Sequence, residues 1–249
     1  MAGHSHWAGI KHKKAIVDKK RGKLWSKLAR AIIQAAQLGG GDPGMNLRLK
    51  YAIDKARAAN MPKDTIAKAI QRGTGELEGS SYEEILYEGY GSGGVAVMVD
   101  VLTDNRNRTV GELRKIFEKR GGNMGNSGCV AWQFENKTQV RVSKEVADED
   151  TLMETVLDAG VEDIEDIGDE WLITGPVDAF QSTCDALEAA ELERLSAEVG
   201  YVPTATVPLD AEGARKILAL MEDLDDHDDV QNAYANFDLP DEVMAELEE

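Results

Sequence analysis

The residues of this sequence best suited to chemistry are the lysines and arginines crowded into its first third. Residues 1–72 hold 16 Lys and Arg against 4 Asp and Glu, a net charge of +12, and the remainder holds 12 against 42, a net charge of −30. A phosphate backbone requires several flexible cations spaced along one surface. The overall charge of −18 conceals this division. A nucleic acid responds to the local charge and not to the total, because at physiological salt charges more than about 8 Å apart are largely screened. The basic third is therefore predicted to bind a nucleic acid.

The cations form one face of a predicted helix over about residues 19–38. At 100° per residue, Lys20, Lys23, Lys27 and Arg30 fall within an arc of about 80°, and apolar residues such as Leu28 and Ile32 lie on the opposite side. The next predicted helix adds Arg48, Lys50, Lys55 and Arg57, of which Arg48 and Lys55 are predicted to extend the patch. The predicted nucleic-acid-binding residues are Lys11, Lys13, Lys14, Lys19, Lys20, Arg21, Lys23, Lys27, Arg30, Arg48 and Lys55.

Two other interpretations of this basic face stay open. It could be an ordinary solvated surface, although the acids that usually alternate with lysine on such a face are almost absent. It could bind an anionic membrane, although the apolar side of the helix is needed for a helical core. The nucleic-acid hypothesis also requires that these cations are not already neutralised by the protein's own carboxylates.

A second candidate is the loop that joins a predicted strand over 95–101 to a predicted helix over 109–119. Arg106 and Arg108 could hold a phosphate here, and functional residues often occupy such loops. Capping of the helix by Asp104, Asn105 or Asn107 is the alternative. We predict a possible functional loop formed by Asn105, Arg106, Asn107 and Arg108. The glycine-rich loop at 121–128 is expected to need positive backbone angles or close approach to a partner.

No catalytic or metal-binding constellation stands out. The N-terminal histidines, His4, His6 and His12, have no carboxylate or cysteine companion nearby. Gly89, Gly91 and Gly94 match G-x-G-x-x-G in form, but the loop precedes a strand, so a tight turn is favoured over a phosphate cradle.

The acidic run over 222–229 lacks the spacing and the turn glycine of a calcium loop, and it is expected to be a solvated helix end. We therefore predict no enzyme, no catalytic residues, no metal, no cofactor and no small-molecule substrate.

The periodicity predicts an α+β protein. Helices are expected over about 19–38, from an Asp42-Pro43 cap to 59, and over 62–73, followed by two units of β-α-β type. In the later part, strands are expected around 95–101, 130–134, 140–142, 171–174, 198–206 and 232–239. Helices are expected over 109–119, around 152–157, over 177–190 and over 211–224. The last helix and strand could complete the first α+β unit, which would leave the second as an insertion. The predicted domains are 1–75, 80–135 plus 206–241, and 136–205.

No apolar run approaches the length of a membrane span, and residues 1–30 lack the apolar centre of a signal peptide. Two distant cysteines, Cys129 and Cys184, suit a reducing compartment. We expect a cytoplasmic protein with no membrane partner.

Seven motifs are distributed along the chain: residues 2–7 (AGHSHW), 10–14 (IKHKK), 59–64 (ANMPKD), 87–91 (YEGYG), 102–109 (LTDNRNRT), 121–123 (GGN) and 223–231 (DLDDHDDVQ). Together they resemble the YebC/PmpR family. The match spans almost the whole chain. Small departures are His6 where Lys is frequent, Ser92 where Pro is frequent and Trp25 where Phe is frequent.

The resemblance implies three domains, with the third inserted in the second, and a cytoplasmic bacterial protein without known catalytic activity. Members are described as DNA-binding transcriptional regulators, whereas relatives, among them a mitochondrial translational activator, are linked to the ribosome and to relief of translation stalled at proline runs. We predict a DNA-binding transcriptional regulator. The alternative is a translation factor that binds ribosomal RNA, with the ribosome as a possible partner.

Overall fold

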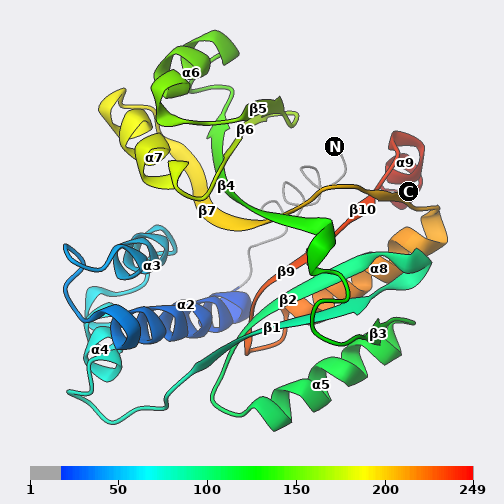
Figure 1. Cartoon of the computed structure of the whole chain (residues 1–249), viewed down its shortest axis with the longest axis horizontal. Coiled ribbons are helices and arrows are strands. Elements are labelled where there is room, and N and C mark those ends of the chain that lie inside the picture. The colour runs from blue at the N-terminus through cyan, green and yellow to red at the C-terminus, as the bar shows by residue number, and fades with distance from the viewer. Residues whose placement is uncertain (1–17, 249) are drawn as a thin grey trace. The chain divides into compact units, whose positions relative to one another are not determined.

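The computed structural model describes residues 18–248, without the side chains of residues 18–21, 241 and 248. The chain divides into two compact units (Figure 1). Within the described residues, the first unit is built from 18–129 and 215–233, and the second from 130–214 and 234–248. None of the helices in this range combines the length and the apolar composition needed to cross a bilayer.

Three helices open the first unit: α2 (Asp18–Gly39), α3 (Leu47–Ala58) and α4 (Lys63–Gly73). Their apolar stripes meet in one core, where Ile32, Leu49 and Ala56 are fully buried. Trp25 Nε1 donates to the Ala59 carbonyl at 2.9 Å and ties α2 to the end of α3. The amphipathic pattern of the sequence therefore identified these helices and their inward faces.

The predicted start of α3 is wrong. The helix begins at Leu47 because Asn46, and not Asp42, is its N-cap: Asn46 Oδ1 accepts from the Leu49 N–H at 3.1 Å. The Asn46 amide also donates to the carbonyls of Ala35 and Gly40, each at 2.8 Å, which fixes the α2–α3 turn. These two long-range bonds are invisible in a local sequence pattern.

The first unit also contains a four-stranded sheet in the order β3-β1-β2-β9. Its strands are β1 (Glu83–Tyr90), β2 (Ala96–Thr103), β3 (Asn123–Met124) and β9 (Val230–Ala235), and its helices are α5 (Arg106–Lys119) and α8 (Ala211–Asp225). β1 and β2 form an antiparallel hairpin across the turn η1 (Ser92–Gly94). A Cβ at Gly91 would lie 2.4 Å from Ile217 Cδ1, and Gly94 has φ +78. The predicted tight turn is confirmed.

The second unit has a sheet in the order β5-β6-β4-β7, with all neighbours antiparallel. Its strands are β4 (Phe134–Ser143), β5 (Asp163–Asp166), β6 (Glu170–Gly175) and β7 (Arg194–Pro203). Its helices are α6 (Glu149–Val156), which continues into η3 (Leu157–Ala159), α7 (Ala179–Ala189) and α9 (Asp241–Glu248). The short strands β8 (Val207–Pro208) and β10 (Phe237–Asp238) pair in parallel. The predicted α+β fold class is confirmed.

Two strand predictions are wrong in detail. The alternation at Val130, Trp132 and Phe134 does not continue a strand, because Ala131–Gln133 form the short helix η2 and Trp132 is 74% exposed. The closing strand predicted over 232–239 is two strands, β9 and β10, which belong to different sheets. β9 lies beside β2, so the C-terminal segment does return to the first α+β sheet. The predicted domain boundaries themselves stay a prediction.

Candidate nucleic-acid interface

The predicted binding residues fall into three groups. Lys11, Lys13 and Lys14, like His4, His6 and His12, lie outside the described residues, and the side chains of Lys19, Lys20 and Arg21 are not described. Lys23, Lys27 and Arg30 lie on α2. Arg48 and Lys55 lie on α3.

The cationic face of α2 contacts the loop between α8 and β9. We call residues 225–229 of this loop the acidic segment. Lys23 Nζ donates to the Asp226 carbonyl at 2.9 Å, and Lys27 Nζ donates to the Asp225 carbonyl. Lys23 Nζ also lies 3.9 Å from an Asp228 carboxylate oxygen. Lys23, Lys27 and Arg30, all predicted to contact phosphate, thus already face carbonyl or carboxylate oxygens of the same chain. The condition that these cations stand free of the protein's own acids is not met on this face.

Asp229 anchors the acidic segment. Its carboxylate accepts from Arg30 at 2.9 Å, from Arg108 at 2.6 Å and from the Thr109 hydroxyl at 2.7 Å. Arg30 also donates to the Asp228 carbonyl. Only 2% of Asp229 is exposed, and although burial raises the pKa of its carboxyl, hydrogen bonds from Thr109 and Arg108 and the charge of Arg30 lower the pKa below its ordinary value. Asp229 is therefore a charged, fully bonded group that joins α2 to α5.

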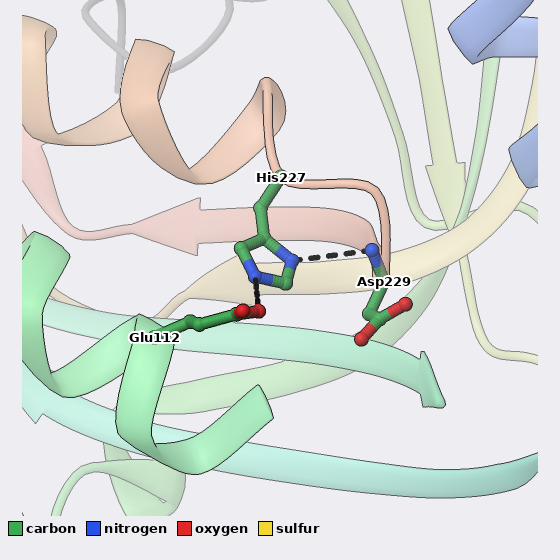
Figure 2. Close-up of side chains that lie close together, drawn as sticks. All are labelled: Glu112, His227 and Asp229. Carbon is green, nitrogen blue, oxygen red and sulfur yellow. Dashed lines mark hydrogen bonds and ion pairs between the residues drawn. The ribbon is translucent and has the colours of Figure 1, made fainter. Parts of the chain in front are cut away.

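The remaining side chains around Asp229 tie the segment to α5. His227 Nδ1 accepts from the Asp229 N–H at 3.1 Å, and His227 Nε2 lies 2.9 Å from Glu112 Oε2 (Figure 2). An accepting Nδ1 places the proton of a neutral imidazole on Nε2, which then donates to Glu112. Glu112, His227 and Asp229 are close enough to be considered as ligands of a metal ion. The atoms that would bind a metal are instead engaged in hydrogen bonds within the protein, and two guanidinium groups already neutralise Asp229.

The expectation for the acidic run changes here. The prediction that it is a solvated helix end is wrong for Asp229, which is buried, and for Asp223, which accepts two bonds from Arg120, at 2.8 and 3.0 Å. The partners are distant in the sequence: the separation is 199 positions for Arg30 and Asp229 and 103 positions for Arg120 and Asp223. No local pattern could therefore indicate them.

In the possible functional loop, Asn105 caps α5 by accepting from the Arg108 N–H at 3.1 Å. Arg108 is held by Asp229 and Asp104. Arg106 and Asn107 are exposed, and Arg106 lies 3.6 Å from Glu83. The prediction that Arg106–Arg108 belong to a loop is wrong, because they form the first turn of α5. These residues serve the cap and the Asp229 cluster, and a phosphate role for Arg106 stays a prediction.

On α3, Arg48 and Lys55 are seven residues apart and share one side of the helix. Arg48 pairs with Glu84 at 2.8 Å, with both side chains about half exposed. Near them, Asp100 on β2 has its pKa raised to about 6, chiefly by burial and by the charge of Glu84. The sheet thus supplies acids on this side of α3.

The outward sides of α3 and α4 are different. The predicted list of binding residues leaves out Lys50, Lys63, Lys68 and Arg72, all of which are exposed. None of these four side chains has an ion-pair or side-chain hydrogen-bond partner among the residues that the structure describes. A helical projection could have found Lys68 and Arg72, which are four residues apart and lie about 120–160° around α4 from buried Ile66.

Comparisons with known proteins place the whole chain. Residues 5–76 match the model of the TACO1/YebC protein N-terminal domain, and residues 82–237 match that of the TACO1/YebC second and third domain. A relative from Dictyoglomus turgidum is 54% identical over 250 residues, which cover 99% of this chain and all of that protein. One from Geobacter sulfurreducens is 52% identical, over 99% of this chain and all of that protein. Both are named probable transcriptional regulatory proteins.

A crystal structure of a conserved hypothetical protein from Aquifex aeolicus is also similar. It has a TM-score of 0.87 and 46% identity, and the match covers 95% of this chain and 98% of that one. Because both family models match and these relatives share more than half of their residues with it over nearly the full length, this chain belongs to the TACO1/YebC family.

Proposed function

We propose that this chain is a cytoplasmic nucleic-acid-binding regulator of gene expression that acts on transcription by contacting DNA. The observation that carries the proposal is a set of exposed cations on α3 and α4 that have no acidic partner among the described residues: Lys50, Lys63, Lys68 and Arg72. A polyanion gains most from cations that it need not take from a carboxylate. The names of the relatives support regulation of transcription.

The predicted contact residues divide within this proposal. Lys23, Lys27 and Arg30 become contacts only where a nucleic acid competes with the acidic segment. The function needs no catalytic group and no bound metal. The predicted residues that remain proposed contacts, beside the outward cations of α3 and α4, are Lys11, Lys13, Lys14, Lys19, Lys20, Arg21, Arg48 and Lys55.

Salt-dependent binding tests the proposal. The affinity of the full chain is measured for a DNA duplex and for a folded ribosomal RNA fragment between about 50 and 200 mM salt. For duplex DNA, log affinity should fall linearly with log salt, by about 0.9 per phosphate contact. A variant with Lys50, Lys63, Lys68 and Arg72 changed to Glu should lose binding and keep its fold. Wild-type affinity in this folded variant would refute the proposed surface.

Ribosomal RNA is the second candidate target. The exposed cations are distributed over two helices, which suits the irregular surface of a folded RNA better than a single groove. Preferential binding to the RNA fragment, together with co-sedimentation of the protein with ribosomes, would favour the translational role. A footprint restricted to particular promoters at physiological salt would favour the transcriptional one.

A further inference from the structure

The contact between α2 and the acidic segment has the chemistry of a competitor for nucleic acid. We propose that residues 225–229 form an autoinhibitory contact, in which the protein's own oxygens occupy cations of α2 that phosphates would otherwise bind. The proposal rests on the proposed function and adds regulation of that same surface. The chain would then bind nucleic acid more weakly than its cations allow, until the segment is displaced.

The acidic segment presents oxygen acceptors to the cations of α2, as a phosphate backbone would. Lys23 and Lys27 donate to backbone carbonyls, and Arg30 donates both to a carbonyl and to the Asp229 carboxylate. Arg30 also lies over the Tyr82 ring, with its guanidinium carbon 5.7 Å from the ring centroid. A phosphodiester offers oxygen acceptors and a negative charge to the same three side chains. The two ligands therefore exclude one another at these three side chains.

The segment consists of an anchor and a more weakly held part. Asp229 is the anchor, buried and bonded to two arginines. Asp226 and Asp228 are exposed, and the Lys23–Asp228 pair is long, at 3.9 Å between side chains that are 45% and 63% exposed. Exposed pairs of this kind contribute little to stability and weaken with salt. The part that faces Lys23 and Lys27 can thus yield to a polyanion while Asp229 stays in place.

The test is to neutralise the weakly held part without disturbing the anchor. In Asp226→Asn/Asp228→Asn, the backbone carbonyls and Asp229 remain, but two negative charges beside α2 are lost. Affinity for a DNA duplex at about 100 mM salt should rise about 3- to 10-fold, since the loss of one exposed charge changes an affinity by somewhat less than tenfold. The matched control is Asp150→Asn/Asp158→Asn, which removes two exposed charges from the second unit and should leave the affinity within about twofold.

A second measurement reports on displacement itself. Hydrogen exchange of residues 225–229 in the wild-type chain should become faster when duplex is bound, because the Lys23 and Lys27 contacts are lost. Equal affinities of the wild type and both double variants, with unchanged exchange in the segment, would overturn the autoinhibition and leave the proposed function standing. An equal rise in both double variants would assign the effect to net charge and would also overturn it. Absence of binding to DNA and to RNA in all three proteins would instead refute the proposed function, and the autoinhibition with it.

Discussion

Two cationic surfaces on the same group of helices have opposite surroundings. On α2, Lys23, Lys27 and Arg30 contact the acidic segment of the same unit. On the outward sides of α3 and α4, Lys50 and Lys68 contact no acid among the described residues. The sequence makes the α2 face look like the stronger candidate for nucleic acid, because its cations are denser. Density of charge along a helix therefore does not show whether a surface is free, since the opposing charge can come from a distant part of the chain.

The largest expected effect separates the two surfaces by stability. Lys27→Glu/Arg30→Glu removes a donor from buried Asp229 and adds repulsion beside it, so the free energy of unfolding should fall by about 4 kcal/mol. Lys50→Glu/Lys68→Glu changes the same number of charges on the open surface and should stay within about 0.5 kcal/mol of wild type. Urea denaturation measures both. Similar losses in the two variants would show that the contrast between the surfaces is not real.

Removing the anchor charge should have the next largest effect. Asp229→Asn leaves Arg30 and Arg108 without their carboxylate and should cost about 2–3 kcal/mol at pH 7. Because the pKa of Asp229 is lowered in the folded chain, its contribution is fully present above the ordinary Asp pKa of about 4 and is lost as the pH falls through the folded value. The difference in stability between wild type and variant should therefore shrink below pH 4. A difference that is constant from pH 7 to pH 3 would argue against an ionised, bonded Asp229.

Asp100 offers the reverse case, a partly buried acid that cations compensate poorly. Its pKa is raised to about 6, so the folded state binds the proton more tightly than the unfolded state, and stability falls as the pH rises from about 4 to 6. Asp100→Asn should stabilise the protein by about 1–2 kcal/mol at pH 8, less than the full shift implies, because Asp100 is partly exposed and bonds Asn232. Thermal melts at pH 8 and pH 4 test this. A gain of the same size at both pH values would contradict the assignment.

The smallest effect concerns single lysines in binding. Lys50→Gln should lower the salt slope of duplex binding by up to about 0.9, whereas Lys23→Gln should lower it less because Lys23 already faces the Asp226 carbonyl and the Asp228 carboxylate. In the Asp226→Asn/Asp228→Asn background, the Lys23 effect should grow toward that of Lys50. Equal slopes for the two single variants in the wild-type background would remove the distinction between an occupied and an open surface.

The sequence alone determined the α+β class, the three leading helices and most of their inward faces. Periodicity suffices for this, because burial of an apolar stripe follows from the spacing of residues along one helix. It also identified the segment Asn105–Arg108 as unusual and left cap and phosphate roles open. The structure shows the cap. Sequence patterns missed β5 and α9 and misplaced the start of α3, where the deciding partners of Asn46 are the carbonyls of Ala35 and Gly40.

Only the tertiary structure decided which charges meet. Asp229 looks like one acid among many in the sequence, yet it joins Arg30, Arg108 and Thr109 from two other elements. A helical pattern orders side chains within about one turn, whereas an ion pair depends on positions that chain folding brings together regardless of sequence distance. The sequence could therefore state how much positive charge α2 carries. Whether that charge faces solvent or the chain's own acidic segment is a property of the fold.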